Sequence, residues 1–210
     1  MKFAIVLLGL VSLAFSAPQP RKVFHENVED FLNLINDVAG EELFELMEHY
    51  AEFEEFWVSI NYLTTADFKN LVYEMESLPE FKAVIDFLEK DNIDIMYFID
   101  RFNFILEEAT GPQGFKKSRH QLSGRDFNSF INDCVAALPK DQLAALFDQK
   151  LAEDEEFRVA IENLYSEEWA QIYDALWKSE QFQVEIRTLA EHGIEINVLL
   201  NELFAVFGQN

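Results

Sequence analysis

Apart from the acids, side chains that commonly carry chemistry are sparse in this sequence. Its 210 residues include four histidines, at positions 25, 49, 120 and 192, and one cysteine, Cys134. No two histidines stand at metal-binding spacing, and a single cysteine rules out a Cys-pair metal site. The 39 acidic residues are scattered, so no pair of carboxylates is singled out as a general acid and base. No HExxH, GxSxG or Walker A motif occurs. We therefore expect no catalytic residues, no metal and no cofactor, and an enzyme is the least favoured class.

The charge and composition favour an acidic helical protein. Sixteen basic residues against 39 acidic ones give a net charge of −23, which repels nucleic acid and favours solubility. Half of the residues are hydrophobic and 21 are phenylalanine, whereas glycine and proline together number 12. Abundant Leu, Glu and Ala with little Gly or Pro is typical of helices.

Residues 1–16 have the features of a secretory signal. Lys2 supplies the positive start, Ala4 to Phe15 the apolar run, and Ala14-Phe15-Ser16 a small-x-small cleavage pattern. The alternative is an uncleaved membrane anchor, but the run is short for a span of about 20 residues. We expect a secreted, extracellular chain without disulfides, in which Cys134 is a small buried hydrophobic residue.

The elements that must position any site are duplicated. Glu54-Glu55-Phe56-x-Val58-x-Ile60-x-x-Leu63 returns 101 residues later as Glu155-Glu156-Phe157-x-Val159-x-Ile161-x-x-Leu164. The same spacing relates Phe81 to Phe182 and Leu88 to Leu189. A self-similarity over 53 positions indicates a duplicated structural unit, and what it retains is an apolar skeleton.

This duplication predicts an all-α chain of two repeats with about six short helices each. The expected divisions are a flexible lead (17–26), repeat one (27–107), a linker (108–124) and repeat two (125–208). Gly40 is expected to end the first helix, Thr64-x-x-Asp67 to cap the fourth, and Ser77-Leu78-Pro79-Glu80 to start the fifth. Residues 93–106 and 194–207, apolar on nearly every side, are expected to form central helices.

Two smaller features complete the outline. Asn92 and Gly193 occupy equivalent turns, and both residue types accept a left-handed backbone. The linker contains Lys116, Lys117 and Arg119. It is either an exposed connector, a contact for anionic lipid headgroups or a protease-sensitive hinge.

The duplicated unit resembles a known family. Its EEFxxxIxxL start, the pattern Phe81-x-x-x-Ile85-x-x-Leu88 and the Ile-x-Ile start of the last helix are similar to the insect allergen-repeat family. That family includes the major cockroach allergen repeats and the blood-meal-associated midgut proteins of mosquitoes, and the short chain most resembles the mosquito branch. The resemblance implies a shell of twelve helices around an apolar cavity that holds fatty acyl chains or phospholipid.

The resemblance also defines the expected site and partners. The apolar side chains expected to contact lipid are Phe56, Ile60, Leu63, Phe68, Leu71, Phe81, Ile85, Leu88, Ile95, Phe98, Phe102, Phe157, Ile161, Leu164, Trp169, Ile172, Phe182, Ile186, Leu189, Ile196, Leu199 and Leu203. The implied function is a lipid-binding and lipid-transfer protein of the gut lumen, monomeric, in transient contact with membranes and membrane-disrupting at high concentration. The alternative is a structural or protective secreted gut protein with a filled core and no ligand. No residue supports the diversion of plant glucosinolate products, a role associated with some relatives.

Overall fold

The computed structural model describes residues 23–93, 122–198 and 200, in which all regular secondary structure is helical. The all-α prediction is confirmed for these residues. Outside the described residues lie the expected secretory signal at 1–16, most of the linker and most of both predicted central helices. The helices are α2 (Val23–Tyr50), α3 (Glu54–Leu63), α4 (Ala66–Ser77), α5 (Pro79–Glu89), α7 (Phe127–Ala137), α8 (Lys140–Glu153), α9 (Glu155–Leu164), α10 (Glu167–Lys178) and α11 (Glu180–Glu191).

The bounds of the helices repeat with the spacing of the sequence. Helix α9 begins and ends 101 residues after α3, and α10 does so after α4. The local cause is a pair of equivalent caps. The Thr65 hydroxyl accepts a hydrogen bond from the Phe68 N–H, and the Ser166 hydroxyl accepts one from the Trp169 N–H, both at 3.1 Å. These hydroxyls satisfy backbone donors that the first turn of a helix leaves unpaired.

Two details of the expected caps were wrong. The cap of α4 is Thr65, not Thr64, whose hydroxyl donates instead to the Asn61 carbonyl. The segment Ser77-Leu78-Pro79-Glu80 contains no capping side chain for α5, because the N-terminal cap is the apolar Leu78 and the Ser77 hydroxyl donates to the Glu74 carbonyl. Pro79 does occupy the start of α5, where its missing N–H costs no helical hydrogen bond.

The expected helix end at Gly40 was also wrong, because α2 continues through it as one helix of 28 residues. Gly40 has no positive φ, and a glycine with helical dihedrals weakens a helix without ending it. The corresponding part of the second half is divided by Leu138-Pro139. Leu138 is extended, with φ −67° and ψ 143°, as the residue before proline tends to be. The first two helices expected in repeat one are therefore a single helix.

The equivalent turns at Asn92 and Gly193 are confirmed. Their φ values are 58° and 75°, the positive values among the described residues. In each turn the following isoleucine donates to the carbonyl five residues back, Ile93 to Leu88 and Ile194 to Leu189, both at 3.0 Å. This is the hydrogen bonding of a Schellman motif, in which a left-handed residue ends the helix. Both isoleucines are buried in the core.

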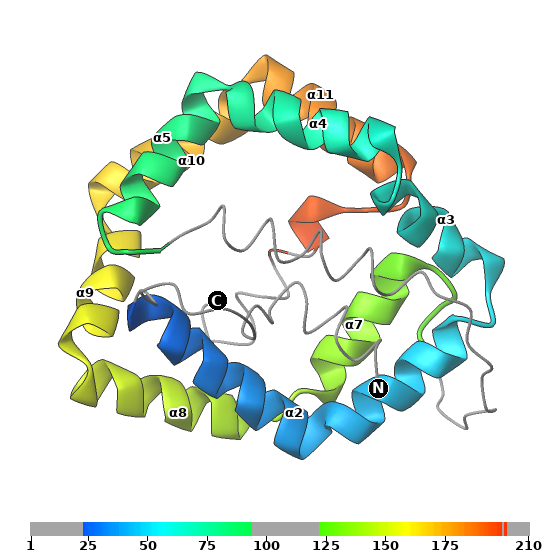
Figure 1. The fold of residues 1–210 in the computed structure, drawn as a ribbon, viewed down its shortest axis with the longest axis horizontal. Helices are drawn as coiled ribbons and strands as arrows, with labels where there is room; N and C mark the ends of the chain where they lie inside the picture. Colours follow the sequence, from blue (N-terminus) through cyan, green and yellow to red (C-terminus); the bar gives the residue numbers. More distant parts are fainter. Residues whose placement is uncertain (1–22, 94–121, 199, 201–210) are drawn as a thin grey trace.

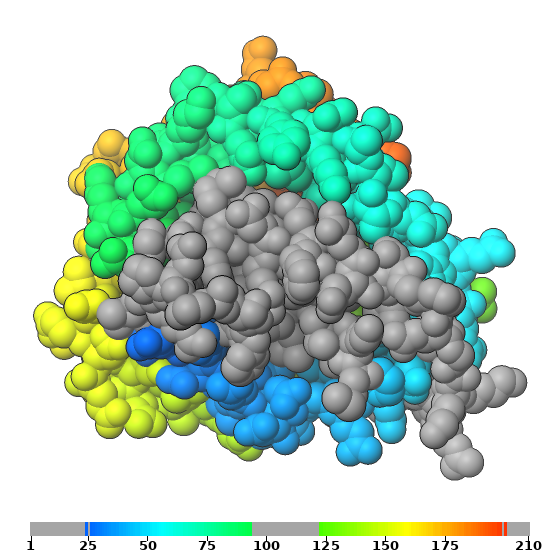
Figure 2. Space-filling model, in the orientation of Figure 1, coloured from blue at the N-terminus to red at the C-terminus, as the bar shows by residue number. Residues whose placement is uncertain are grey.

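The described helices form a closed ring (Figure 1). Following contacts between helices, α2 packs on α7, α7 on α3, α3 on α4, α4 on α5, α5 on α10, α10 on α9, α9 on α8 and α8 again on α2. Helix α11 packs on α4 and α10. In the space-filling view α2 lies along the lower rim of one face and α4 and α5 along the upper rim (Figure 2). None of the described helices is long and apolar enough to cross a membrane.

Contacts between the two halves of the chain are reciprocal. Helix α5 packs on α10 and α4 packs on α11, so each half contributes the same two helices to this contact. Likewise α3 packs on α7 while its equivalent, α9, packs on α2. An exchange of this kind, in which element i meets j and j meets i, is the signature of two-fold symmetry. The halves therefore share one core rather than each enclosing its own.

Candidate functional site

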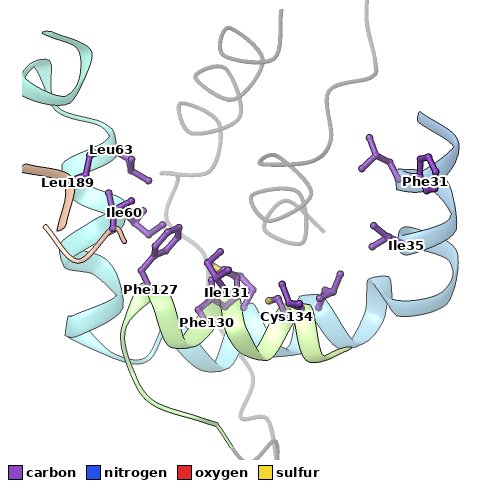
Figure 3. Close-up of a cluster of buried hydrophobic side chains, with 14 of the residues drawn as sticks. Phe31, Ile35, Ile60, Leu63, Phe127, Phe130, Ile131, Cys134 and Leu189 are labelled. Atoms are coloured by element: carbon purple, nitrogen blue, oxygen red, sulfur yellow. The ribbon is translucent and has the colours of Figure 1, made fainter. Parts of the chain in front are cut away.

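The candidate site is the apolar inner side of the ring. In the close-up, Ile131 and Cys134 of α7 and Ile35 of α2 project toward the middle of the ring (Figure 3). Ile60 and Leu63 of α3 meet Leu189 of α11 on another side of the same cluster (Figure 3). Each helix presents apolar residues at helical spacing to this side, so the sequence places them there through periodicity alone.

Phe56 and Phe157, equivalent residues in the two halves, are each the centre of an aromatic cluster. The Phe56 ring lies 5.2 Å from Phe130 and 6.2 Å from Tyr50. The Phe157 ring lies 5.8 Å from Phe24 and 5.7 Å from Phe147. Both are almost completely buried, at 0% and 3% exposure. Ring centroids between 4.5 and 7 Å apart are the normal spacing of packed aromatic pairs, so these two positions anchor the helices beside them.

Most of the residues expected to contact lipid lie in or against one core. The buried ones are Phe56, Ile60, Leu63, Phe68, Leu71, Leu88, Phe157, Phe182, Ile186 and Leu189. Partly buried ones that pack on this core are Phe81, Ile161, Leu164, Trp169, Ile172 and Ile196, and Ile85 is also partly buried. Ile172 additionally lines a groove on the outer side of the ring. The remaining predicted residues, Ile95, Phe98, Phe102, Leu199 and Leu203, lie outside the described residues.

Several of the most buried side chains were not among the predicted site residues. Phe127, Phe130, Leu43, Met47 and Leu143 are all less than 2% exposed. They belong to the first helices of each half, which lie outside the 53 positions that recur at a spacing of 101 residues. A signal was available, because Phe31 and Ile35 recur at Phe127 and Ile131 with a spacing of 96 residues.

A polar cluster closes the ring where the start of α2 meets α8 and α9. The Lys150 ammonium donates to the Asn27 side-chain oxygen at 2.7 Å and to the Asp30 carboxylate at 2.5 Å. The Asn27 amide nitrogen donates to Asp154 at 2.7 Å, and Asp154 caps α9 by accepting from the Phe157 N–H at 3.0 Å. That backbone bond, assisted by the one from Asn27, holds the pKa of Asp154 below its usual value. Lys150 and Asn27, at 9% and 5% exposure, are thus buried polar groups with partners.

A second polar contact joins the end of α2 to α7. The Tyr50 hydroxyl donates to the Asp133 carboxylate at 2.5 Å, and the Ser123 N–H donates to the same oxygen at 2.9 Å. Burial of the phenol, followed by its bond to Asp133, raises the pKa of Tyr50. The phenol therefore stays protonated and acts here as a hydrogen-bond donor.

The turns at Asn92 and Gly193 are each held by the opposite half of the chain. Ser59 donates to the His192 carbonyl at 2.8 Å, and the Tyr62 ring stacks on the His192 ring with centroids 3.6 Å apart. Burial, followed by the charges of Asp67 and Glu185, raises the pKa of Tyr62. At the equivalent place the Asn163 amide donates to both carboxylate oxygens of Asp91 at 3.0 Å. The C-terminal ends of α5 and α11 are thereby joined to α9 and α3 of the opposite half.

The polar groups in these contacts have structural partners. Within residues 23–93 and 122–198, no three His, Cys, Asp or Glu side chains converge as a metal site. Cys134 is fully buried, as predicted, and burial raises the pKa of its thiol, so it is held in the unreactive protonated form. The chemical capacity of the described inner face is to exclude water and to contact apolar groups.

An all-helical ring made from two equivalent halves, apolar within and acidic outside, defines a class of small helical repeat proteins. The family model described as insect allergen related repeat, nitrile-specifier detoxification, matches residues 23–200. The chain belongs to this insect allergen-related repeat family. A comparison with curated proteins found no match.

Proposed function

We propose that the protein is a secreted lipid-binding and lipid-transfer protein that holds fatty acyl chains or phospholipid inside a helical shell. The observation that carries the proposal is the closed ring with apolar side chains on its inner side (Figure 3). A single layer of helices with every apolar face turned inward encloses space unless side chains fill it. An apolar enclosure with few polar groups accepts an acyl chain without a dedicated polar cage.

The membrane part of the proposal rests on the charge of the protein. The prediction that the apolar segments 93–106 and 194–207 lie inside the shell is part of this proposal. The predicted count of twelve helices is not, because α2 is one helix where two were expected. A net charge of −23 opposes stable attachment to an anionic bilayer, which favours brief membrane contact with exchange of lipid. At high concentration such exchange makes membranes leak. A gut-lumen location, and membership of the mosquito midgut branch, remain predictions from the resemblance.

One observation favours the second candidate, a structural or protective secreted protein with a filled core. Aromatic rings pack around Phe56 and, in a second cluster, around Phe157, and these rings already fill part of the interior. If side chains fill the remainder too, no volume is left for a ligand. The family description also includes nitrile-specifier detoxification, but the described residues converge on no catalytic group that would support transferring that role to this chain.

Mass spectrometry of an organic extract tests the proposal. The full chain is secreted from insect cells and purified, and its extract is compared with that of an unrelated acidic secreted protein from the same cells. Stoichiometric acyl lipid in the first extract alone is expected. Delipidated protein should then gain thermal stability from added fatty acid, about 2.7 kcal/mol when free ligand is 100 times its Kd. A clean extract together with an unchanged melting temperature supports the filled core instead.

A further inference from the structure

Helices α5 and α10 are joined tightly at one end of their contact. Phe87 and Trp169 pack with ring centroids 5.2 Å apart. Beside them Lys90 forms an ion pair with Glu168 at 2.8 Å, and the turn after α5 is bonded to α9 through Asp91. The start of α5 therefore lies toward the end of α10, and a groove lies between the two helices there.

This outer groove has a volume of about 330 Å³ and an apolar floor. Its lining residues are Pro79, Glu80, Ala83, Gln171, Ile172 and Ala175. The volume falls at the lower end of the range for small-molecule sites. Pro79, Gln171 and Ala175 are exposed, so the groove opens on the outer surface, and Ile172 is the residue that it shares with the interior site proposed above.

The equivalent contact in the other half of the molecule has different residues at the groove positions. Helices α4 and α11 form the equivalent contact, where Val184 replaces Ala83 and Glu74 replaces Ala175. Glu80 is likewise replaced by Gln181, which is engaged with Glu185 at 2.7 Å. The groove is thus lined by two alanines at positions where the other contact has the larger residues valine and glutamate.

Glu80 defines the charge that the groove accepts. It is the one charged lining residue, and among the described residues it has no ion-pair partner. Its position in the first turn of α5 suits the positive end of that helix, but a helix end does not supply a full compensating charge. The surrounding charge of −23 raises the local concentration of cations and repels anions.

We propose that the groove between α5 and α10 binds a cationic amphiphile, with an alkyl chain on the Ala83, Ile172 and Ala175 floor and an ammonium head beside Glu80. This site goes beyond the proposed interior lipid site and prefers the opposite headgroup charge. Because the chain is covered from one side only, each additional methylene strengthens binding by about twofold, half of its full transfer free energy. A carboxylate analogue of the same length is excluded by Glu80.

The test uses n-alkylammonium ions of four, six and eight carbons, below their micelle concentrations, and the full secreted chain. The Ala83 and Ala175 methyl groups, labelled with ¹³C, report on the groove by NMR independently of any interior ligand. Saturable shifts of both methyls are expected, with a Kd that tightens along the series. n-Octanoate and n-octanol should leave these methyls unshifted or bind at least about fivefold more weakly, since an ammonium–carboxylate contact near the surface contributes about a factor of five or more.

The other half supplies variants that the fold already accommodates. Ala83→Val and Ala175→Glu copy the residues of the α4–α11 contact and should abolish binding of n-octylammonium. Glu80→Gln should weaken it at least about fivefold, while Glu74→Gln, which removes the same charge at the other contact, should not. Circular dichroism and the remaining methyl signals establish that each variant is folded.

Three results overturn the proposal. The first is equal binding of octanoate and octylammonium, which would make the site indifferent to charge. The second is unchanged octylammonium binding in both Ala83→Val and Glu80→Gln. The third is concentration-dependent shifts of the two methyls without any probe, abolished by Ala83→Val, which would assign the groove to a second copy of the chain. Acyl lipid in the organic extract is a separate readout, so failure here leaves the interior proposal standing.

Discussion

Phe56 and Val58 stand two residues apart on α3, and their environments are opposite. Phe56 is fully buried among Tyr50, Phe127 and Phe130, whereas Val58 is 56% exposed. Phe56→Ala removes a ring from a packed cluster and should lower the free energy of unfolding by about 3–5 kcal/mol. Val58→Ala should change it by less than about 0.5 kcal/mol. Urea unfolding followed by circular dichroism measures both, and equal effects would mean that Phe56 is not an anchor.

Asp154 should make stability depend on pH in the acid range. Its folded pKa is lowered, so its ionised form stabilises the fold above the ordinary value of 3.8 and this contribution is lost as the pH falls through the folded pKa. Asp154→Asn keeps a cap for α9 but removes the titration. The free energy of unfolding of this variant, measured between pH 5 and about 2, should therefore fall less steeply than that of wild type. The difference should be well below the limit of about 1.4 kcal/mol per pH unit, because solvent screens a largely exposed carboxylate.

The control for this titration is Asp148→Asn, an equal charge change at an exposed position of α8. Its pH dependence should stay close to that of wild type. If the two variants behave alike, the effect comes from net charge and not from the bonds of Asp154 to Phe157 and Asn27.

For single residues, the sequence predicts which side chains are buried better than it predicts which residues they contact. Phe56 and Phe157 could be placed inside from periodicity, because a residue on the apolar stripe of a helix faces the core whatever it meets there. The contacts of Asn27 with Lys150 and Asp154 could not be predicted, because Asn27 is more than 120 positions from either residue in the sequence. Such contacts depend on how helices pair, which periodicity does not encode.

Gly40 and Gly193 show how the ends of helices depend on surroundings. Both were expected at helix ends, but only Gly193 has a positive φ, at 75°. A glycine ends a helix only where its backbone leaves the helical region. At Gly40 tertiary packing prevails over propensity, because Ala39, Leu43 and Leu46 of the same helix are buried in the core.

Substituting alanine for these two glycines should have opposite effects. Gly40→Ala should stabilise the protein by about 0.5–1 kcal/mol, since the new Cβ meets only the flexible Asn36 side chain, at 3.2 Å. Gly193→Ala should destabilise it by about 1–3 kcal/mol, from a left-handed alanine and a Cβ placed 2.8 Å from the Ser59 hydroxyl oxygen. Thermal unfolding of the two variants measures both signs.

The first half of the molecule provides a rescue for Gly193. The residues equivalent to Gly193 and Ser59 are Asn92, which has a φ of 58°, and Ala160. Gly193→Asn combined with Ser59→Ala should therefore recover much of the stability that Gly193→Ala loses, because asparagine tolerates the left-handed region and the contact with the hydroxyl is removed. Because Ser59→Ala also removes the hydrogen bond to the His192 carbonyl, the double variant is compared with Gly193→Ala combined with Ser59→Ala. No gain over that control would show that strain at this turn is not the cause.

For the whole molecule, the sequence could predict two equivalent halves but not how they combine. The 101-residue spacing held for the bounds of α3 and α9 and of α4 and α10. For α4 and α10 the reason is local, because Thr65 and Ser166 cap them in the same way. The reciprocal contacts, α5 with α10 and α4 with α11, were not predictable, since an apolar stripe does not specify its partner. The outer groove results from that pairing, so Ala83 and Ala175 carried no signal until the two helices were placed side by side.

Reciprocal contacts also predict how the protein behaves when the chain is cut between its halves. A protease site inserted within 108–124 divides the protein, yet the α2–α7, α3–α7 and α5–α10 contacts all cross the division. Neither half can bury its apolar faces alone, so the cut protein should elute from a sizing column at the size of the intact chain. Unfolding then also separates two molecules, so its melting temperature should rise with protein concentration, whereas that of the uncut chain should not. Phe127→Ala, at the contact with Phe56, should make the cut halves separate at concentrations where the wild-type halves remain joined. Halves that elute apart, or that melt in two concentration-independent steps, would instead establish each repeat as an independent folding unit.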